Sequence, residues 1–213
     1  MEGKIFALEG IDGSGKTTQI QKLASRLTSV KIPVFVSKAI KDEVEGNKQL
    51  LFSLMVAFGF QKNSLATMFL FQALHSQQCE EAKEALKEGR IVLADRWNAS
   101  FWVYHQNFGP LKQKLGILKV LDYIAFQGLI PNVTFLLDLP VEIALERKRL
   151  QERKLVDIFE QEEIDIYRKA RKVYLEMANS NPNWVVIDAT KSIPEVHQEI
   201  WKTISKEVNS LQS

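Results

Sequence analysis

The sequence has few of the features that would place a protein in a membrane or in an oxidising compartment. Its 213 residues include one cysteine, Cys79, so no disulfide can form within the chain. No apolar run approaches the roughly 20 residues that a membrane-spanning helix needs, and no signal-peptide pattern precedes the first predicted strand. We therefore expect a cytoplasmic protein in which Cys79 is a packing residue and not a catalytic thiol.

An excess of charge of one sign is also missing. The chain carries 28 Lys and Arg against 26 Asp and Glu, a net charge of +2. That charge is too small to predict binding to nucleic acid or to an anionic membrane. No repeat, low-complexity tract or linker-like stretch divides the chain, so we expect one domain over residues 1–213.

Residues 10–17, GIDGSGKT, match the phosphate-loop pattern G-x-x-x-x-G-K-[ST] at every fixed position. The apolar run 5–8 before this phosphate loop predicts a buried strand. Residues 16–27 after it carry apolar side chains at helical spacing. Strand, glycine-rich turn and helix are the context that the motif requires, so the sequence predicts binding of ATP or GTP.

The residue types of the phosphate loop suit a polyphosphate. Gly10, Gly13 and Gly15 allow a tight turn in which backbone N–H groups face inward. The positive end of the following helix adds to them. Lys16 would place its ammonium on the β- and γ-phosphates, and the Thr17 hydroxyl would hold Mg²⁺.

Strand-like runs alternate with helical patterns along the rest of the chain. Further strands are predicted at residues 33–36, 91–94, 133–137 and 184–187. Helices are predicted at residues 48–60, 64–88 (with Gly89 as the stop), 98–108, 112–128, from Pro140 onward, 159–177 and 193–208. This order predicts an α/β fold, a five-stranded parallel sheet flanked by helices.

A carboxylate and a guanidinium, Asp95 and Arg96, follow the apolar third strand. In a doubly wound sheet, the carboxyl end of that strand lies beside the phosphate loop. Arg96 can grip two oxygens of a phosphate, and Asp95 can accept from Mg²⁺-bound water or from a lysine. A structural Asp–Arg pair at the strand end is the alternative.

Two charged stretches admit two interpretations each. Five of the nine residues 146–154 are basic, which is typical of a solvated helix face or of a mobile lid whose arginines close over a phosphoryl group. The polar residues 38–48 form a loop in which Lys38 or Lys41 is either solvated or part of a binding site.

With these motifs in place, the sequence resembles the thymidylate kinase family of nucleoside monophosphate kinases. The segments that carry the resemblance are residues 6–19, 95–97 (the D-R-[YHW] motif), 131–140, 142–147 and 187–193, which together span almost the whole chain. The resemblance implies a P-loop NTPase fold of the nucleoside monophosphate kinase type with a short helical lid, about residues 147–158. It also implies transfer of the ATP γ-phosphoryl group to dTMP, giving dTDP and ADP with Mg²⁺, and a homodimer, for which Trp102 is a candidate interface residue.

The family's functional residues map onto this sequence position by position. The catalytic candidates are Lys16, Asp95, Arg96, Arg149 and Arg153. The candidates for binding ATP are Gly10, Asp12, Gly13, Ser14, Gly15, Lys16, Thr17, Thr18 and Arg147, with Thr17 and Asp95 for the metal. The candidates for binding the acceptor are Asp12 (sugar hydroxyl), Phe71 (stacking on thymine), His75, Arg96 (phosphate) and Tyr104 (beside the deoxyribose).

The departures from the family pattern cluster on the acceptor side. His75 stands where the family has an arginine that hydrogen-bonds thymine; it can donate one hydrogen bond but cannot form the same fork. His105 replaces a glutamine, and the Arg-Glu-Pro loop after the second strand is missing. Ser14 stands where some members carry a loop arginine, and members without it usually supply one from the lid, which favours Arg149 and Arg153.

Other functions remain open at this point. One alternative is a deoxynucleoside kinase, which acts on a neutral sugar hydroxyl, or a kinase for another nucleoside monophosphate. A second, of a different class, is a nucleotide-binding protein that no longer turns over.

Overall fold

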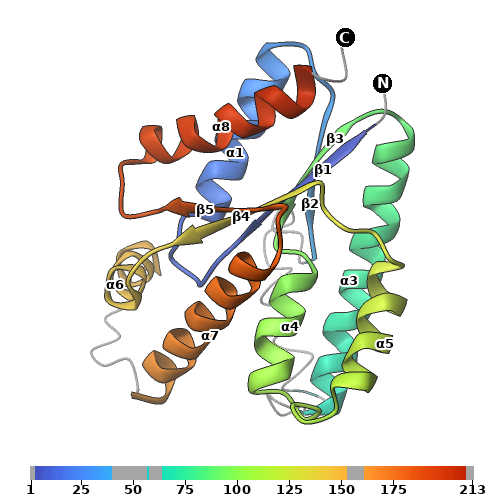
Figure 1. Cartoon of the computed structure of the whole chain (residues 1–213), viewed down its shortest axis with the longest axis vertical. Coiled ribbons are helices and arrows are strands. Elements are labelled where there is room, and N and C mark those ends of the chain that lie inside the picture. Colours follow the sequence, from blue (N-terminus) through green and yellow to red (C-terminus); the bar gives the residue numbers. More distant parts are fainter. Residues whose placement is uncertain (1–2, 40–56, 58–63, 153–160, 210–213) are drawn as a thin grey trace.

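The computed structural model describes residues 3–39, 57, 64–152 and 161–209. Its strands are β1 (Lys4–Glu9), β2 (Val34–Lys38), β3 (Ile91–Asp95), β4 (Val133–Asp138) and β5 (Trp184–Asp188). They form one five-stranded sheet in the order β2-β3-β1-β4-β5, and every neighbouring pair is parallel (Figure 1). The predicted five-stranded parallel sheet is confirmed.

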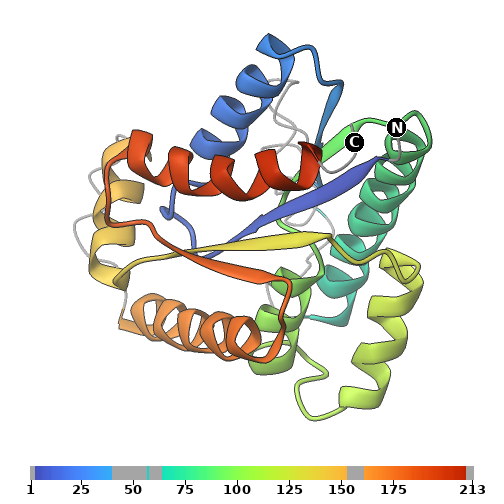
Figure 2. The same ribbon diagram turned by 45° about the horizontal axis from the view of Figure 1, so that its top comes forward.

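Helices cover both faces of the sheet. Those in the described part of the chain are α1 (Lys16–Ser29), α3 (Leu65–Lys87), α4 (Asn98–Asn107), α5 (Leu115–Phe126), α6 (Val141–Glu152), α7 (Gln161–Ser180) and α8 (Ile193–Asn209). Helices α1 and α8 lie on one face, and α3, α4, α5 and α7 lie on the other (Figure 2). The helix predicted at 48–60 lies outside the described residues, apart from residue 57.

The alternation of side chains along β1 explains why its sequence is continuously apolar. Phe6 and Leu8 point into a core that includes side chains of α1 and α8. Ile5 and Ala7 point into a second core with α3 and α5. All four are 0–1% exposed, so the middle of this strand, residues 5–8, is buried on both faces and is apolar throughout.

Local signals set several helix ends correctly. Helix α3 begins after Ser64, whose Oγ accepts a hydrogen bond from the Thr67 backbone N–H at 3.2 Å. It ends before Gly89, which has φ of 73°. Helix α5 was expected from residue 112 but begins at Leu115.

In the described part of the chain, no helix combines the length and apolarity needed to cross a bilayer.

The structure shows the surroundings of two side chains that the sequence analysis discussed, Cys79 and Trp102. Cys79 is buried and donates through Sγ to the Phe126 carbonyl at 3.1 Å, which confirms the packing role. Trp102, the candidate interface residue, is half-buried, with its ring edge-on to Phe101 at 6.0 Å between centroids. It packs there because α4 is sandwiched against α5 and α7.

Each of the five strands ends on a charged residue: Glu9, Lys38, Asp95, Asp138 and Asp188. Since all strands are parallel and in register, with Leu8 opposite Asp95, these charges meet at one edge of the sheet. The phosphate loop leaves β1 at the same edge, as expected for an open α/β sheet.

Candidate active site

The phosphate loop connects β1 to α1 and depends on its glycines in different ways. Gly10, Gly13 and Gly15 have positive φ of 139°, 83° and 93°, in the left-handed region that other residues rarely adopt. A Cβ on Gly13 would lie 2.1 Å from the Ala144 carbonyl oxygen of α6, whereas one on Gly15 would meet nothing within 4 Å. Gly13 is therefore fixed by packing, and Gly15 faces open space.

Helix α1 begins without a side-chain cap. Its N-cap residue is Gly15, and its first turn contains no acidic residue. The first backbone hydrogen bond within the helix runs from Gln19 N–H to the Gly15 carbonyl at 3.1 Å. The N–H groups of Lys16, Thr17 and Thr18 precede it, at the positive end of the helix. Such a helix end binds phosphate.

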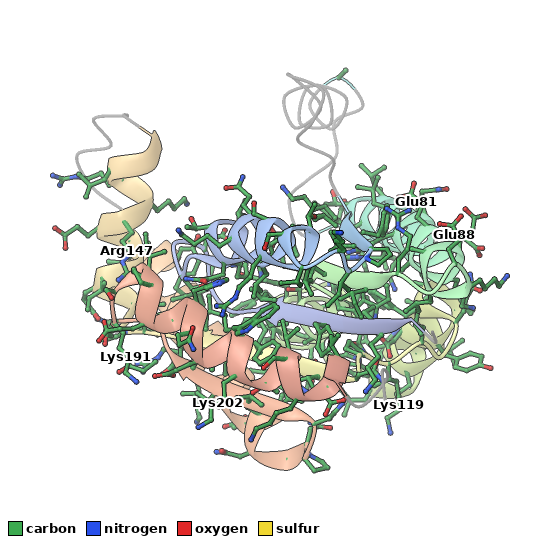
Figure 3. All side chains as sticks on the ribbon, turned by 90° about the horizontal axis from the view of Figure 1, so that it is seen from above. Glu81, Glu88, Lys119, Arg147, Lys191 and Lys202 are labelled. Carbon is green, nitrogen blue, oxygen red and sulfur yellow. The ribbon has the colours of Figure 1, made fainter. Side chains whose placement is uncertain are left out.

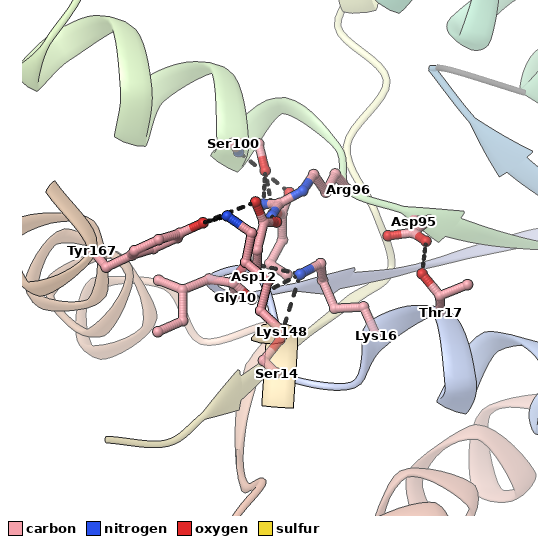
Figure 4. Close-up of polar contacts among 12 residues, drawn as sticks. Gly10, Asp12, Ser14, Lys16, Thr17, Asp95, Arg96, Ser100, Lys148 and Tyr167 are labelled. Carbon is pink, nitrogen blue, oxygen red and sulfur yellow. Dashed lines mark hydrogen bonds and ion pairs between the residues drawn. The ribbon is translucent and has the colours of Figure 1, made fainter. Parts of the chain in front are cut away.

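Lys16 is 7% exposed, and its ammonium lies over the phosphate loop itself. Nζ donates to the carbonyl oxygens of Gly10 at 3.0 Å and Ile11 at 2.9 Å, and lies 3.4 Å from the Ser14 hydroxyl (Figure 4). These partners are uncharged. Burial lowers the pKa of Lys16 to about 8; Arg96 lowers it further, and the nearby carboxylates oppose this. A polyphosphate would stabilise the charged form.

The proposed metal ligands are in contact. The Thr17 hydroxyl, at the start of α1, donates to Asp95 Oδ2 at the end of β3 over 2.8 Å. Hydroxyl and carboxylate oxygens are hard ligands of the kind that Mg²⁺ prefers. The described residues include no group of three or more His, Cys, Asp or Glu placed to hold a metal. A Mg²⁺ ion at Thr17 and Asp95 would thus complete its shell with phosphate and water, which is its usual mode with nucleotides.

Arg96 lies next to the phosphate loop, as predicted, and pairs with Asp12. Its Nη2 donates to Asp12 Oδ1, and its guanidinium lies 5.9 Å from the centre of the Tyr104 ring. Burial favours the neutral carboxyl, but the charges of Arg96 and Lys16 outweigh it and hold the pKa of Asp12 well below its usual value. Arg96 has φ of 67°, which is uncommon for a residue with a side chain.

Two hydrogen bonds of Arg96 were not anticipated. Its Nη1 donates to Ser100 Oγ at 2.9 Å and to the Tyr174 hydroxyl at 3.0 Å. Both oxygens in turn lie next to the carboxylate of Glu9, which is fully buried. One signal was present in the sequence, because an acidic residue closes a strand that is otherwise apolar. Nothing local pointed to Tyr174, which lies 165 positions from Glu9.

A second unanticipated pair, Tyr167 of α7 and Lys148 of α6, interacts with Asp12. The Tyr167 hydroxyl of α7 donates to Asp12 Oδ2 at 3.2 Å. Lys148 of α6 lies 3.4 Å from that hydroxyl through Nζ, and 5.6 Å from the ring centre. Arg149, the predicted lid arginine next to it, is exposed, and Arg153 lies outside the described residues. On α6 it is thus Lys148 whose side chain extends to the phosphate loop (Figure 4).

His75 is buried on α3, and its hydrogen-bond partner fixes its tautomer. Gln78 donates through Nε2 to the Arg96 carbonyl at 3.1 Å, so its Oε1 faces His75 Nδ1, at 3.3 Å. Because an amide oxygen only accepts, Nδ1 carries the proton. Burial lowers the pKa of His75 to about 4, so the ring is neutral at pH 7 and Nε2 is an acceptor. The one N–H group of His75, which was expected to donate a hydrogen bond to the base, therefore already donates to Gln78 within the protein.

The remaining acceptor-side residues come from α3 and α4. Phe71 is half-buried, one turn before His75 on α3. Tyr104 is half-buried, and burial raises its pKa to about 12, so its hydroxyl stays protonated. His105 is half-buried against Phe101, with ring centres 4.9 Å apart. Lys38 ends β2 next to Asp95 in the sheet register, whereas Lys41 lies outside the described residues.

Arg147 lies away from this cluster. Its Nη1 donates to the Ala189 carbonyl at 2.9 Å, in the loop between β5 and α8. Figure 3 shows Arg147 and Lys191 at the same end of the molecule. The contact joins the middle of α6 to the loop between β5 and α8.

Together, the sheet order, the phosphate loop and the facing guanidinium define a P-loop nucleotide-binding protein of the nucleoside monophosphate kinase type. The chain belongs to the thymidylate kinase family, which it matches over residues 8–200. It is similar to the thymidylate kinase of Fervidobacterium nodosum, with 34% identity over 205 residues that cover 93% of this chain and 97% of that protein. It is also similar to the thymidylate kinases of Bartonella quintana, 33% identical over 94% of each chain, and Thermosipho melanesiensis, 33% identical over 93% of this chain and 96% of that one.

Proposed function

We propose that this protein transfers the γ-phosphoryl group of ATP to dTMP, giving dTDP and ADP. The observation that carries the proposal is the position of Arg96, a guanidinium at the end of β3 that pairs with Asp12 of the phosphate loop. It lies across from the loop that would hold ATP. A second phosphate ester held by Arg96 would lie next to the γ-phosphate.

The chain's contribution is to bring two anions together and to offset the charge that develops between them. Lys16 and the N-terminal turn of α1 hold the phosphates of ATP. Arg96 holds the phosphate of the acceptor, and Asp12 faces its sugar hydroxyl. Asp12 is also close enough to both cations, Arg96 and Lys16, for their charges to lower its pKa.

Mg²⁺ fits the hydroxyl–carboxylate pair of Thr17 and Asp95, and no residue would have to move far to supply these oxygens. When bound, the ion neutralises charge on the β- and γ-phosphates. The chain's own task there is to orient the two oxygens, through a hydrogen bond between β3 and α1.

The base side of the acceptor site consists of Phe71, which stacks on the base, with His75 at its edge and Tyr104 beside the sugar. Arg147 lies on the adenine side of ATP. Arg149 and Arg153 supply charge from the lid, which is about residues 147–158. The whole chain forms a single domain.

A panel of acceptors tests this proposal. Purified protein with ATP and Mg²⁺ is offered dTMP, dCMP, dGMP, AMP and the corresponding deoxynucleosides, and products are separated by chromatography. We expect dTDP and ADP in equal amounts with dTMP as the preferred acceptor. A preference for another monophosphate corrects the substrate, and a preference for a deoxynucleoside replaces the proposal by a deoxynucleoside kinase. ATP binding without transfer to any acceptor supports the non-catalytic alternative.

A homodimer in the cytoplasm is part of the proposal. The support is an exposed apolar surface on and just after α5, formed by Leu115, Ile117, Val120, Tyr123, Ile124 and Ile130, which are 46–69% exposed. An apolar surface of this kind is typical of an interface, and two copies of α5 related by a two-fold axis would cover it. Light scattering should give twice the mass of the chain. Val120→Glu with Ile124→Glu should give the monomer, whereas Val30→Glu, at a 51% exposed site after α1, should not.

A further inference from the structure

The guanidinium of Arg96 is held on its inner side by a network of three buried groups. Its Nη1 donates to Ser100 Oγ at 2.9 Å and to the Tyr174 hydroxyl at 3.0 Å. Ser100 lies 2.7 Å and Tyr174 3.2 Å from the same oxygen, Oε2 of Glu9. Glu9 Oε1 accepts from the Trp97 backbone N–H at 2.7 Å, so both of its oxygens are engaged.

The hydrogens of this network can be assigned by counting. A carboxylate only accepts, and each hydroxyl has a single hydrogen. Ser100 and Tyr174 lie 2.8 Å apart, so their two hydrogens point at Glu9 or at each other. In either arrangement no hydroxyl hydrogen points at Arg96, and both oxygens accept from Nη1. Burial raises the pKa of Glu9, and the charge of Arg96 and the bonds from Ser100 and Trp97 oppose that rise.

The same count shows which donors of Arg96 remain. A guanidinium has five N–H hydrogens. Two on Nη1 are taken by Ser100 and Tyr174, and one on Nη2 is taken by Asp12. One donor on Nε and one on Nη2 are left, and the Tyr104 hydroxyl lies close enough to interact with the same guanidinium. A pair of N–H groups on neighbouring guanidinium nitrogens is the fork that binds a phosphate through two oxygens.

We propose that Glu9, Ser100 and Tyr174 are positioning residues that hold Arg96 in the orientation in which its Nε–Nη2 edge receives the acceptor's phosphate. This inference rests on the proposed function and names residues that act through Arg96. The backbone is held as well: Arg96 N–H donates to the Leu8 carbonyl at 3.1 Å, and φ is 67°. A side chain on a backbone of this kind is retained where its direction matters.

Removal of single oxygens tests the proposal. Tyr174→Phe and Ser100→Ala each delete one hydroxyl that accepts from Nη1 and keep the remaining packing. We expect kcat/KM for the acceptor, at saturating ATP, to fall about tenfold to a hundredfold, the effect of losing a hydrogen bond to a charged group. KM for ATP should stay within about twofold, because Lys16 and α1 are untouched. Ser180→Ala, at an exposed site at the end of α7, is the matched control for Ser100→Ala and should change neither value.

A double-mutant cycle separates positioning from general stability. In an Arg96→Ala background, Tyr174→Phe should still lower the melting temperature but should leave the Kd of dTMP unchanged, since the guanidinium through which it acts is gone. The positioning role would be overturned if Tyr174→Phe weakened dTMP binding equally in both backgrounds. It would also be overturned if the variant raised KM for ATP as much as KM for the acceptor.

The wild-type protein is assayed first, which keeps the two proposals apart. Failure of the wild type to phosphorylate any monophosphate counts against the proposed function. Wild-type activity together with unchanged acceptor kinetics in Tyr174→Phe and Ser100→Ala counts against the positioning role alone. If a monophosphate other than dTMP is the acceptor, the same variants are compared with that compound.

Discussion

The two halves of the site are built in different ways. The half that would hold ATP is local: eight consecutive residues supply the turn, the ammonium and the hydroxyl, and most contacts there are with backbone atoms. The half that would hold the acceptor is assembled from side chains of β1, α3, β3, α4 and α7. Glu9 and Tyr174, for example, meet across 165 positions of sequence.

This difference decides where the chain has room to vary. A backbone cradle fits any nucleoside triphosphate, and the loop motif must be kept whole for it to form. A side-chain assembly can change its base-facing members while it keeps the phosphate-holding core of Arg96 and Glu9. The histidines at 75 and 105, where the family pattern has arginine and glutamine, fit that division. Variants that separate the halves therefore make the sharpest tests.

The largest effect is expected from the ammonium of the ATP half. Lys16→Ala should lower kcat/KM by a factor on the order of 10³, the loss typical of removing one charged group that stabilises the transferred phosphoryl. Steady-state kinetics with dTMP measures it. Lys22→Ala, at an exposed site on the same helix, removes the same charge and should stay near the wild-type rate. Turnover by Lys16→Ala close to that of Lys22→Ala would contradict the role of Lys16 in this half.

The contrast between the halves also accounts for what sequence reasoning could reach. The strands, the phosphate loop and the ends of α3 depend on patterns a few residues long, so hydrophobic period and turn residues predicted them. The position of Arg96 beside the phosphate loop followed from the topological rule for parallel sheets, whereas its pairing with Asp12 was not predicted. The packing of Trp102 was not predicted, because the contact of α4 with α5 and α7 has no local signature.

The missed residues have a common physical reason. Tyr167 and Tyr174 lie seven positions apart on α7, where they read as ordinary aromatics of an amphipathic helix. Their role depends on the angle at which α7 packs beside α4 and the phosphate loop. Likewise, the tautomer of His75 is set by Gln78 and the Arg96 carbonyl. Periodicity carries no information about such contacts.

A second prediction tests whether the conformation of the phosphate loop depends only on its own residues or also on its contact with α6. Gly13→Ala should lower the free energy of unfolding by about 3 kcal/mol, from a left-handed backbone and an overpacked contact with Ala144 of α6. Gly15→Ala has the same backbone cost, about 1–2 kcal/mol, but no neighbour to displace. Chemical denaturation measures both. Equal losses would show that α6 does not constrain the loop, and the ATP half would then be local in full.

A third prediction concerns pH and touches only the ATP half. The pKa of Lys16 is lowered to about 8, chiefly by burial, and ATP favours the charged form, so the Kd of ATP should rise toward tenfold per pH unit above pH 8. In the same range the unfolded chain keeps a proton that the folded chain has lost. The contribution of Lys16 to the free energy of unfolding therefore rises between pH 8 and 10.5 while affinity falls.

Calorimetric titration with ATP between pH 7 and 9.5 checks this, with proton uptake on binding as a second signal. Lys16→Arg, whose guanidinium does not titrate, is the control and should bind with a flat profile. A flat profile in the wild type would mean that Lys16 is already charged throughout, and that burial has less influence on this half than the structure indicates.

The smallest effect is expected at the base edge of the acceptor half. His75 presents a hydrogen-bond acceptor, Nε2, because its N–H group at Nδ1 donates to Gln78 Oε1. Thymine can donate through its ring N–H and cytosine through its amino group, so this ring should discriminate weakly between dTMP and dCMP. His75→Arg introduces donors only, which suit the O4 acceptor of thymine and oppose the amino group of cytosine. The ratio of kcat/KM for dTMP over dCMP should therefore rise about two- to tenfold, the range of a single hydrogen bond to a partly solvated base edge. Gln77→Arg adds the same charge at an exposed position on α3 and should leave the ratio unchanged. An unchanged ratio in a folded His75→Arg protein would mean that another residue contacts the edge of the base. The division between a fixed phosphate core and a variable base side would then have to be redrawn without His75.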